Sequence, residues 1–303
     1  MLTRSAPGRA VVTGATGGLG YETAAGLARA GARVVLAGRN AAKGDAALAR
    51  LRRDVPGAAV EFEMLDLASL ASVEAFAGRM LGTHPALDTL VNNAGVMAPP
   101  ARRTTADGFE LQFGVNYLGH FALTARLMPA LLRAEAGARV VQVSSVAHRR
   151  GRIAWDDLQG ERRYDAWAAY SQSKLAMLMF ALELARRAQA QGWPLVSTAA
   201  HPGWAATDLI ANGPGGGTAG IRGRLLDTGF RLFAQSAADG AMPLIHAAAS
   251  PDAKAGGYYG PTGLGEIKGP PGPARVMPQA RDEAAGKRLW TISETLAKVS
   301  FPA

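Results

Sequence analysis

The chain has 303 residues, of which 48% are hydrophobic and 19% charged, a composition typical of a globular protein and not of a disordered one. It contains no cysteine, which excludes disulfides, thiolate metal sites and thiol catalysis. The net charge of +9 does not indicate nucleic-acid binding, because the basic residues are scattered in pairs and triplets and form no basic stripe.

The length allows one large α/β domain or two smaller ones. The first residues lead almost at once into an apolar run at 9–14, with no preceding stretch that resembles a signal peptide. No run of ~18 apolar residues occurs, so no membrane span is expected. We therefore expect a cytoplasmic protein.

Short apolar runs alternate with longer amphipathic stretches along the chain. The runs that predict strands are 9–14, 32–38, 58–67, 87–95, 138–145 and 194–203. The stretches between them, for example 18–30 and 41–54, predict helices. This rhythm of strand, helix and strand indicates an α/β fold, a doubly wound parallel sheet of about seven strands with helices on both faces.

Two segments depart from this rhythm. Residues 211–223 are too rich in glycine for the interior of an element, and they predict a mobile loop. Residues 260–279 are rich in proline and glycine, and they predict a loop before a last helix at about 280–299. Because no core-sized segment follows either loop, residues 1–303 are predicted to form a single domain.

A glycine-rich turn, TGATGGLG, follows the first predicted strand and opens the first predicted helix. It contains Gly14, Gly18 and Gly20. Glycines let a backbone approach a pyrophosphate closely, and a helix N-terminus offers unpaired N–H groups and the positive end of a dipole. The alternative is a tight turn with incidental glycines, but the position between strand and helix favours a dinucleotide site.

The residue after the second predicted strand bears on the choice of dinucleotide. Sites for NAD place a carboxylate there to bind the ribose 2′-hydroxyl, whereas this chain has Gly38 and then Arg39. The planar guanidinium of an arginine can make two charged hydrogen bonds to a 2′-phosphate. NADP(H) is therefore preferred, with NAD(H) possible, and the alternative is an arginine that is simply exposed in a loop.

Polar and small residues gather at the ends of the later strands. They are Asp66, the segment NNAG at 92–95, VSS at 143–145 and HPG at 201–203. Because ligands bind along the carboxyl edge of a doubly wound sheet, these residues are expected to converge beside the dinucleotide.

Tyr170 and Lys174 lie one helical turn apart and share a helix face. A nearby cation stabilises a phenolate and lowers the pKa of the phenol toward useful acid–base strength. A hydroxyl from Ser145 could in turn stabilise the negative charge on a reacting carbonyl oxygen. Taken alone, the pair is more simply a packed tyrosine and a solvated lysine; beside a nucleotide turn, it indicates catalysis.

Together these motifs resemble the classical short-chain dehydrogenase/reductase family. They are Thr13-Gly14-x-x-x-Gly18-x-Gly20, Asn92-Asn93-Ala94-Gly95, Asn116, Ser145, Tyr170-x-x-x-Lys174 and Pro202-Gly203. They stand in family order and span residues 13–207. The segments GRN and SSVAH, and the 25 positions from Ser145 to Tyr170, resemble the retinol dehydrogenase-like branch.

The resemblance implies a Rossmann-type fold and a role for each matched residue. Tyr170 would be the general acid–base, and Lys174 would lower its pKa and bind the nicotinamide ribose. Ser145, not its neighbour Ser144, would polarise the carbonyl, and Asn116 would hold a water linking Lys174 to solvent. The implied cofactor-binding residues are Gly14, Thr16, Gly18, Leu19, Gly20, Arg39, Asp66, Leu67, Asn93, Ala94, Gly95, Tyr170, Lys174, Pro202, Gly203 and Thr207.

The implied activity is an NADP(H)-dependent oxidoreductase that interconverts a carbonyl and an alcohol by hydride transfer. Alternatives on the same fold are an isomerase or dehydratase that retains its cofactor, and a non-catalytic dinucleotide sensor. A loop at about 204–233 would cover the site, and Met97, Trp204, Leu209 and Ile210 would form an apolar wall, which indicates a hydrophobic or aromatic substrate. The family also implies a homodimer or homotetramer, with no nucleic-acid partner.

Overall fold

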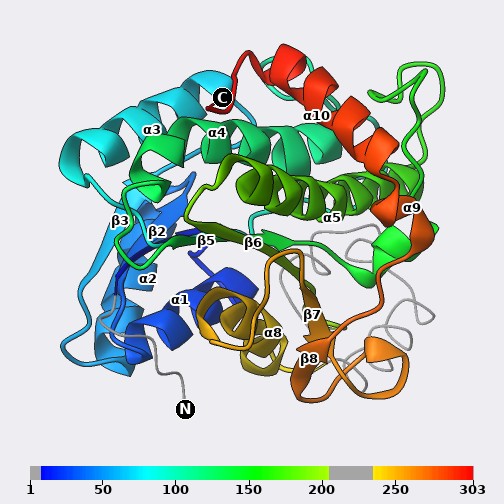
Figure 1. Cartoon of the computed structure of the whole chain (residues 1–303). Coiled ribbons are helices and arrows are strands. Elements are labelled where there is room, and N and C mark those ends of the chain that lie inside the picture. The colour runs from blue at the N-terminus through cyan, green and yellow to red at the C-terminus, as the bar shows by residue number, and fades with distance from the viewer. Residues whose placement is uncertain (1–7, 205–234, 303) are drawn as a thin grey trace.

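The computed structural model describes residues 8–204 and 235–302 (Figure 1). Within these residues eight strands form one sheet in the order β3-β2-β1-β4-β5-β6-β7-β8. The strands are β1 Arg9–Thr13, β2 Arg33–Gly38, β3 Val60–Met64, β4 Thr89–Asn92, β5 Ala138–Val143, β6 Leu195–Ala200, β7 Tyr258–Pro261 and β8 Pro271–Pro273. All neighbours are parallel except β7 and β8, which are antiparallel.

The predicted α/β fold is confirmed, and the six predicted strands all form, but the sheet is larger by one than the predicted seven. The seventh strand, β7, was not located by the sequence pattern, and its last two residues fall in the segment predicted as a loop at 260–279. The extra strand is β8, inside the same segment. Two of its three residues are prolines, which cannot donate ladder hydrogen bonds and are tolerated only on an edge strand. A strand of this composition carries no alternating pattern, so the sequence did not reveal it.

The helices cover both faces of the sheet. They are α1 Gly18–Arg29, α2 Ala41–Asp54, α3 Leu70–Thr83, α4 Gly119–Leu131, α5 Ala166–Gln191, α8 Ala237–Ala249, α9 Pro278–Arg281 and α10 Glu283–Ala297. Three shorter turns are η1 Phe113–Leu118, η2 Val146–Arg150 and η3 Leu264–Glu266. The predicted last helix is interrupted at Asp282, whose carboxylate accepts from the Ala285 N–H and so starts α10 anew. None of the helices in the described ranges is long and apolar enough to cross a membrane.

Two separate hydrophobic cores follow from strand alternation. Val11 and Val35 face the core under α3, α4 and α5, while Val12 and Leu36 face the core under α1, α2 and α8. Figure 1 shows these two helical layers above and below the sheet, with α10 lying outside α5. The near-continuous apolar strands are those expected of a parallel sheet buried on both faces.

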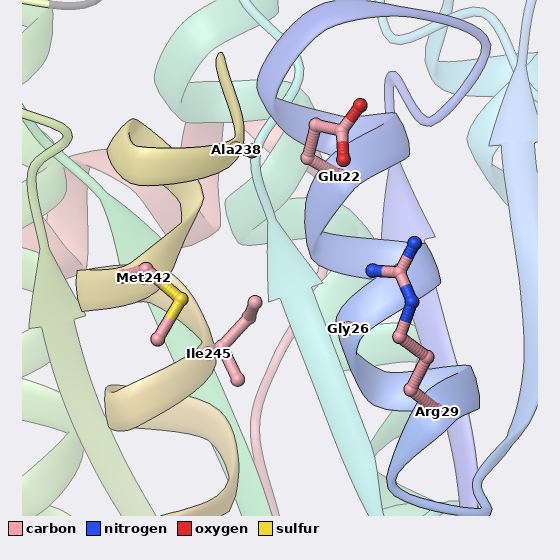
Figure 2. A pocket seen from close by; sticks show the side chains of 6 residues that line it. All are labelled: Glu22, Gly26, Arg29, Ala238, Met242 and Ile245. Carbon is pink, nitrogen blue, oxygen red and sulfur yellow. The ribbon is translucent and has the colours of Figure 1, made fainter. Parts of the chain in front are cut away.

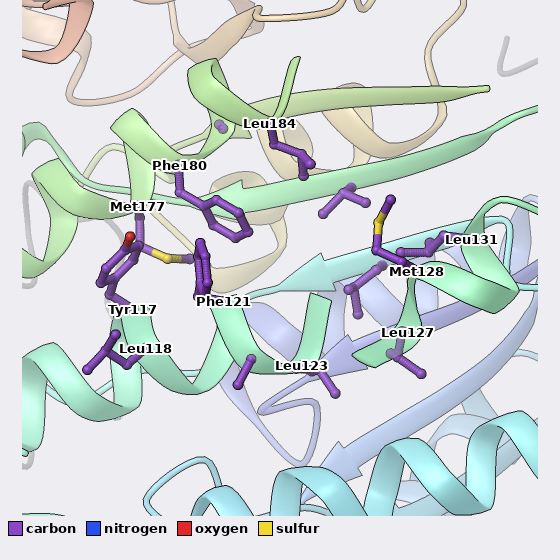
Figure 3. Packing of buried hydrophobic residues seen from close by; sticks show 14 of the residues in the cluster. Tyr117, Leu118, Phe121, Leu123, Leu127, Met128, Leu131, Met177, Phe180 and Leu184 are labelled. Carbon is purple, nitrogen blue, oxygen red and sulfur yellow. The ribbon is translucent and has the colours of Figure 1, made fainter. Parts of the chain in front are cut away.

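The core under α4 and α5 is rich in aromatic side chains (Figure 3). The rings of Phe121 and Phe180 lie 5.1 Å apart, and Trp290 of α10 lies 5.1 Å and 5.7 Å from them. Trp290 is 1% exposed. Burying side chains of this size contributes about 1.5–3 kcal/mol each, which fixes α5 and the residues it carries against the sheet.

Strand order places the candidate site. The chain builds β1, β2 and β3 outward in one direction and then returns to add β4 on the other side of β1. The order therefore reverses between β1 and β4, and ligands of open α/β sheets bind at the carboxyl edge at such a point. Thr13, Asn92, Val143 and Ala200 end the four central strands at this edge.

Candidate active site

The glycine-rich turn between β1 and α1 has the geometry of an anion cradle. Gly14 and Gly18 adopt positive φ angles of 65° and 52°, which side-chain-bearing residues rarely adopt. A Cβ on Gly20 would lie 2.3 Å from the Gly14 carbonyl oxygen, so only glycine permits this close packing. No side chain among the described residues caps the α1 N-terminus at Gly17, which leaves its N–H groups for a phosphate.

Thr13 joins this turn to the NNAG segment. Its Oγ1 accepts hydrogen bonds from the backbone N–H groups of Asn93 and Ala94, both at 2.9 Å. The Asn93 side chain donates back to the Thr13 carbonyl at 2.7 Å. These bonds hold two predicted cofactor segments, from β1 and β4, as one rigid edge.

His120 extends this network and was missed at the level of sequence. Its Nε2 lies 2.9 Å from Thr13 Oγ1, and its Nδ1 lies 2.9 Å from the Asn116 carbonyl oxygen. Because the Asn116 carbonyl oxygen can only accept, Nδ1 carries the ring proton, and Nε2 accepts from the Thr13 hydroxyl. Burial lowers the pKa of His120 to about 3, so the ring stays neutral. Its position one turn after Asn116 was the available signal.

Asn116 lies in η1, a π-helical turn of the kind that often marks functional sites. Its Oδ1 accepts from the Val96 N–H at 2.7 Å, and its Nδ2 donates to the Val96 carbonyl and to Ser173 Oγ, both at 2.9 Å. A Cβ on Gly95 would lie 3.2 Å from Asn116 Oδ1 and 3.6 Å from Lys174 Nζ. The structure thus brings Asn116, Gly95 and Lys174 together.

The two serines after β5 have different surroundings. Ser144 is 2% exposed, and its hydroxyl donates to the Lys174 backbone carbonyl at 2.7 Å. The Ser145 hydroxyl instead accepts from the Ala147 N–H at 3.2 Å and is within hydrogen-bonding reach of the Tyr170 phenol. Of the pair, Ser145 is the one that faces the tyrosine.

Tyr170 and Lys174 are both buried on α5, at 7% and 4% exposure. Lys174 Nζ donates to the Val143 carbonyl at 3.0 Å and lies 5.8 Å from the centre of the Tyr170 ring. The expected lowering of the tyrosine pKa is not found. Burial raises the pKa of Tyr170 to about 12, with the Ser145 hydrogen bond acting in the opposite direction, and burial lowers the pKa of Lys174 to about 8.

The residues predicted to bind the adenosine end of the dinucleotide include an exposed arginine. The Arg39 side chain is exposed, and within the described residues no hydrogen bond or ion pair engages it. Thr16 packs beside Gly38, where an added Cβ would lie 2.9 Å from Thr16 Cγ2. Asp66 Oδ1 accepts from the Ala68 N–H at 3.0 Å, and Leu67 is buried against Gly119. Leu19 is half-buried in the first turn of α1.

Pro202 and Gly203 follow β6 at the same edge of the sheet, and Gly203 has a φ of 67°. Met97 is half-buried, and Trp204 is 42% exposed. Thr207, Leu209, Ile210 and most of the predicted covering loop lie outside the described residues. Trp167, which the sequence did not single out, lies one turn before Tyr170, and the centres of their rings are 6.0 Å apart.

A separate groove of about 260 Å³ lies between α1 and α8 (Figure 2). Its lining residues are Glu22, Gly26, Arg29, Ala238, Met242 and Ile245. A Cβ on Gly26 would lie 2.3 Å from Ile245 Cδ1, so the two helices meet closely here. None of the predicted site residues lines this groove.

The fold and site define a short-chain dehydrogenase. The family model for short chain dehydrogenases matches residues 9–213, and the chain belongs to this family. Among its relatives are mouse retinol dehydrogenase 12, 41% identical over 97% of this chain and 88% of that protein, and mouse polyprenol dehydrogenase, 42% identical over 94% and 82%. The resemblance to the retinol dehydrogenase-like branch is thereby confirmed.

Solved structures agree with this assignment. A crystal structure of a Mycobacterium paratuberculosis protein is 40% identical, covers 97% of this chain and 95% of that chain, and has a TM-score of 0.78. A short-chain dehydrogenase of Shigella flexneri complexed with NADP is 26% identical over 82% of this chain and 95% of that chain, with a TM-score of 0.63. The family and the glycine cradle support an oxidoreductase that uses a nicotinamide dinucleotide.

Proposed function

We propose that the protein is an NADP(H)-dependent oxidoreductase that interconverts an aldehyde or ketone and the corresponding alcohol, on a hydrophobic or aromatic substrate. The observation that carries this proposal is the placement of Tyr170. Its phenol lies beside the Ser145 hydroxyl and near the Lys174 ammonium, at the sheet edge that also bears the glycine cradle.

The bound dinucleotide would supply or accept the hydride. The chain supplies the proton: Tyr170 donates its phenolic proton to the carbonyl oxygen as negative charge develops there. Ser145 donates a hydrogen bond to the same oxygen and so stabilises that charge. Because the pKa of Tyr170 is about 12, the phenol holds its proton throughout the physiological range, ready for reduction.

Lys174 contributes its charge at the moment of proton transfer. With a pKa of about 8, its ammonium is mostly protonated at neutral pH and stabilises the phenolate that remains on Tyr170. Its hydrogen bond to the Val143 carbonyl and the bond from Ser144 to its own carbonyl fix it at the end of β5. Asn116 and Ser173 hold the neighbouring turn of α5.

The preference for NADP(H) rests on Arg39. Its guanidinium is exposed directly after β2, and the Gly38–Asn40 segment contains no carboxylate that would bind a 2′-hydroxyl or repel a 2′-phosphate. The NADP complex of the Shigella relative is consistent with this choice.

The substrate class follows from the aromatic and apolar side chains near Tyr170. Trp167 is 53% exposed and Trp204 42% exposed, at the start of α5 and beside Gly203. Large exposed apolar side chains at a site indicate binding of an apolar ligand. The names of the relatives, retinol and polyprenol dehydrogenases, point to alcohols of the same character.

The test is a panel of hydrophobic aldehydes, ketones and alcohols, followed by absorbance of the reduced dinucleotide with NADPH and with NADH. We expect turnover of at least one aromatic or long-chain aldehyde, faster with NADPH. Tight NADPH binding without turnover of any panel member in either direction would overturn the proposal and favour the dinucleotide sensor.

A further inference from the structure

The proline- and glycine-rich loop that follows β7 packs against the Pro202–Gly203 turn. The Trp204 N–H donates to the Ile267 carbonyl at 2.9 Å. A Cβ on Gly203 would lie 2.3 Å from the Ile267 carbonyl oxygen and 3.0 Å from that of Glu266. The loop and the turn therefore meet backbone to backbone, at a site where only glycine fits.

Glu266 is the centre of this contact. Its Oε2 lies 2.9 Å from His201 Nε2 and 2.7 Å from an Arg149 guanidinium nitrogen, and its Oε1 accepts from the Arg275 N–H at 3.0 Å. Glu266 has a φ of 60°, which is uncommon for a residue with a side chain. The carboxylate thus joins three chain segments that are distant in the sequence.

The proton arrangement on His201 is determined by its neighbours. Its Nδ1 accepts from the Gly203 N–H at 3.1 Å, so the ring proton is on Nε2 and is donated to Glu266. The ring is fully buried, and a Cβ on Gly260 would lie 2.0 Å from its Nε2. Held between Gly203 and Glu266, the imidazole fixes the turn in which the nicotinamide end of the cofactor is expected to bind.

Arg149 connects Glu266 to the segment that carries Ser145. It lies in η2, which begins directly after Ser145, the residue whose hydroxyl caps that turn. Besides the ion pair with Glu266, Arg149 donates to the Gly265 carbonyl at 3.4 Å. One carboxylate therefore contacts both the segment that carries Ser145 and the segment that carries Gly203.

We propose that Glu266 is a positioning residue of the reaction: through His201 and Arg149 it fixes the Pro202–Gly203 turn relative to Ser145, and so sets the place of the nicotinamide end of the dinucleotide. This inference rests on the proposed function. The preorganised turn and serine would meet the dinucleotide and the substrate carbonyl without rearrangement.

Only a carboxylate meets the demands of this position. It accepts from three donors on two oxygens, whereas a glutamine offers one oxygen and turns an NH2 group toward a donor. Glu266→Gln should therefore weaken the contacts with His201 and with Arg149 while keeping the size of the side chain. The matched control is Glu74→Gln, which removes an ion pair with Arg126 from a glutamate that is 66% exposed.

The experiment compares the binding of NADPH with that of 2′,5′-ADP, which carries the adenosine half alone. Glu266→Gln should raise the Kd for NADPH roughly tenfold and lower kcat, because charged hydrogen bonds of this kind are worth about that factor. The Kd for 2′,5′-ADP should stay unchanged, whereas a general loss of structure would raise both. Glu74→Gln should behave like the wild-type protein.

An unchanged NADPH Kd and kcat in a folded Glu266→Gln variant, with normal wild-type binding, would overturn the positioning role alone. A wild-type protein that binds neither ligand would overturn the proposed function itself.

If Glu266→Gln does not fold, a second pair of variants tests the ion pair between Arg149 of η2 and Glu266. Arg149→Met should raise the NADPH Kd several-fold, and Arg149→Lys, which keeps a cation opposite Glu266, should restore most of the affinity. Equal NADPH affinities for Arg149→Met and the wild-type protein, with equal melting temperatures, would overturn this connection.

Discussion

The hydroxyl of Ser144 donates to the backbone carbonyl of Lys174 at 2.7 Å and so joins the end of β5 to helix α5, which carries Tyr170. Ser144 is therefore used for structure, although it precedes by one position the serine with the proposed catalytic role. The two neighbours alternate in direction because they continue an extended strand, so the Ser144 hydroxyl reaches the backbone of α5 and the Ser145 hydroxyl faces the Tyr170 phenol on the same helix.

Replacing each serine by alanine should separate these roles. Ser145→Ala should lower kcat roughly 100- to 1000-fold, the usual cost of removing a donor to a developing oxyanion. Ser144→Ala should keep kcat within a few-fold and lose about 1 kcal/mol of unfolding free energy with the buried hydrogen bond. Steady-state kinetics and thermal melts provide both readouts, and the reverse pattern would contradict the assignment.

Tyr170→Phe should lower turnover by roughly 100- to 10,000-fold, because it removes the proton donor and keeps the ring. NADPH affinity, measured by fluorescence titration, should change little. Tyr259→Phe is the matched control, since Tyr259 lies in β7, its hydroxyl accepts from the Lys254 N–H, and it faces no proposed reacting group. Substantial activity in Tyr170→Phe would refute the proposed mechanism.

Arg39→Asp should raise the Kd for NADPH by roughly 10- to 100-fold, because a charged hydrogen-bond donor becomes a group that repels phosphate. The Kd for NADH should rise little or fall. Arg33→Asp makes the same charge change at the opposite end of β2, where the arginine is also exposed, and should affect neither dinucleotide. Equal losses for NADPH and NADH in Arg39→Asp would remove the basis for an NADP preference.

The buried ammonium of Lys174 predicts a pH-dependent stability difference. Its pKa is about 8 in the folded protein and 10.5 ordinarily, so between these values the unfolded chain binds more protons and wild-type stability rises with pH. Lys174→Met removes this contribution. The unfolding free energy of Lys174→Met should exceed that of the wild-type protein by the largest amount below pH 8. This difference should shrink by about 3 kcal/mol as the pH rises toward 10.5.

Denaturant unfolding of both proteins across this range measures that difference. A difference that is constant with pH, or that grows as pH rises, would show that Lys174 is not a depressed-pKa cation in the folded protein. Both proteins carry Tyr170→Phe in this measurement, because Tyr170 and Lys174 are neighbours and their titrations are coupled. The more distant tyrosines with raised pKa values titrate in both proteins, so their contributions cancel.

The alternation of strands and helices could be predicted because the apolar residues of each element repeat with the spacing typical of a strand or a helix. The helix at 41–54 has the predicted bounds, and the six predicted strands form within their predicted ranges. The elements that escaped prediction lack such a period. β8 consists of Pro-Gly-Pro, and its pairing depends on β7, while the break at Asp282 depends on one capping carboxylate.

The same distinction applies to the site: the identity of its residues could be predicted, but their environment could not. Gly14, Gly20 and Tyr170 are identified by spacing along one turn or one helix, so the chain itself shows them. The raised pKa of Tyr170 was not visible, because it follows from burial under elements brought in from elsewhere in the chain.

The sequence by itself determined the family, the order of the strands along the chain and the set of side chains that meet at the carboxyl edge. Only the tertiary structure decided what holds those side chains: His120 against Thr13, Ser144 against Lys174, and Glu266 against His201. The physical reason is the separation along the sequence of the residues that interact. Motif spacing reflects local geometry, whereas a hydrogen bond between residues 65 positions apart exists only once the sheet has assembled.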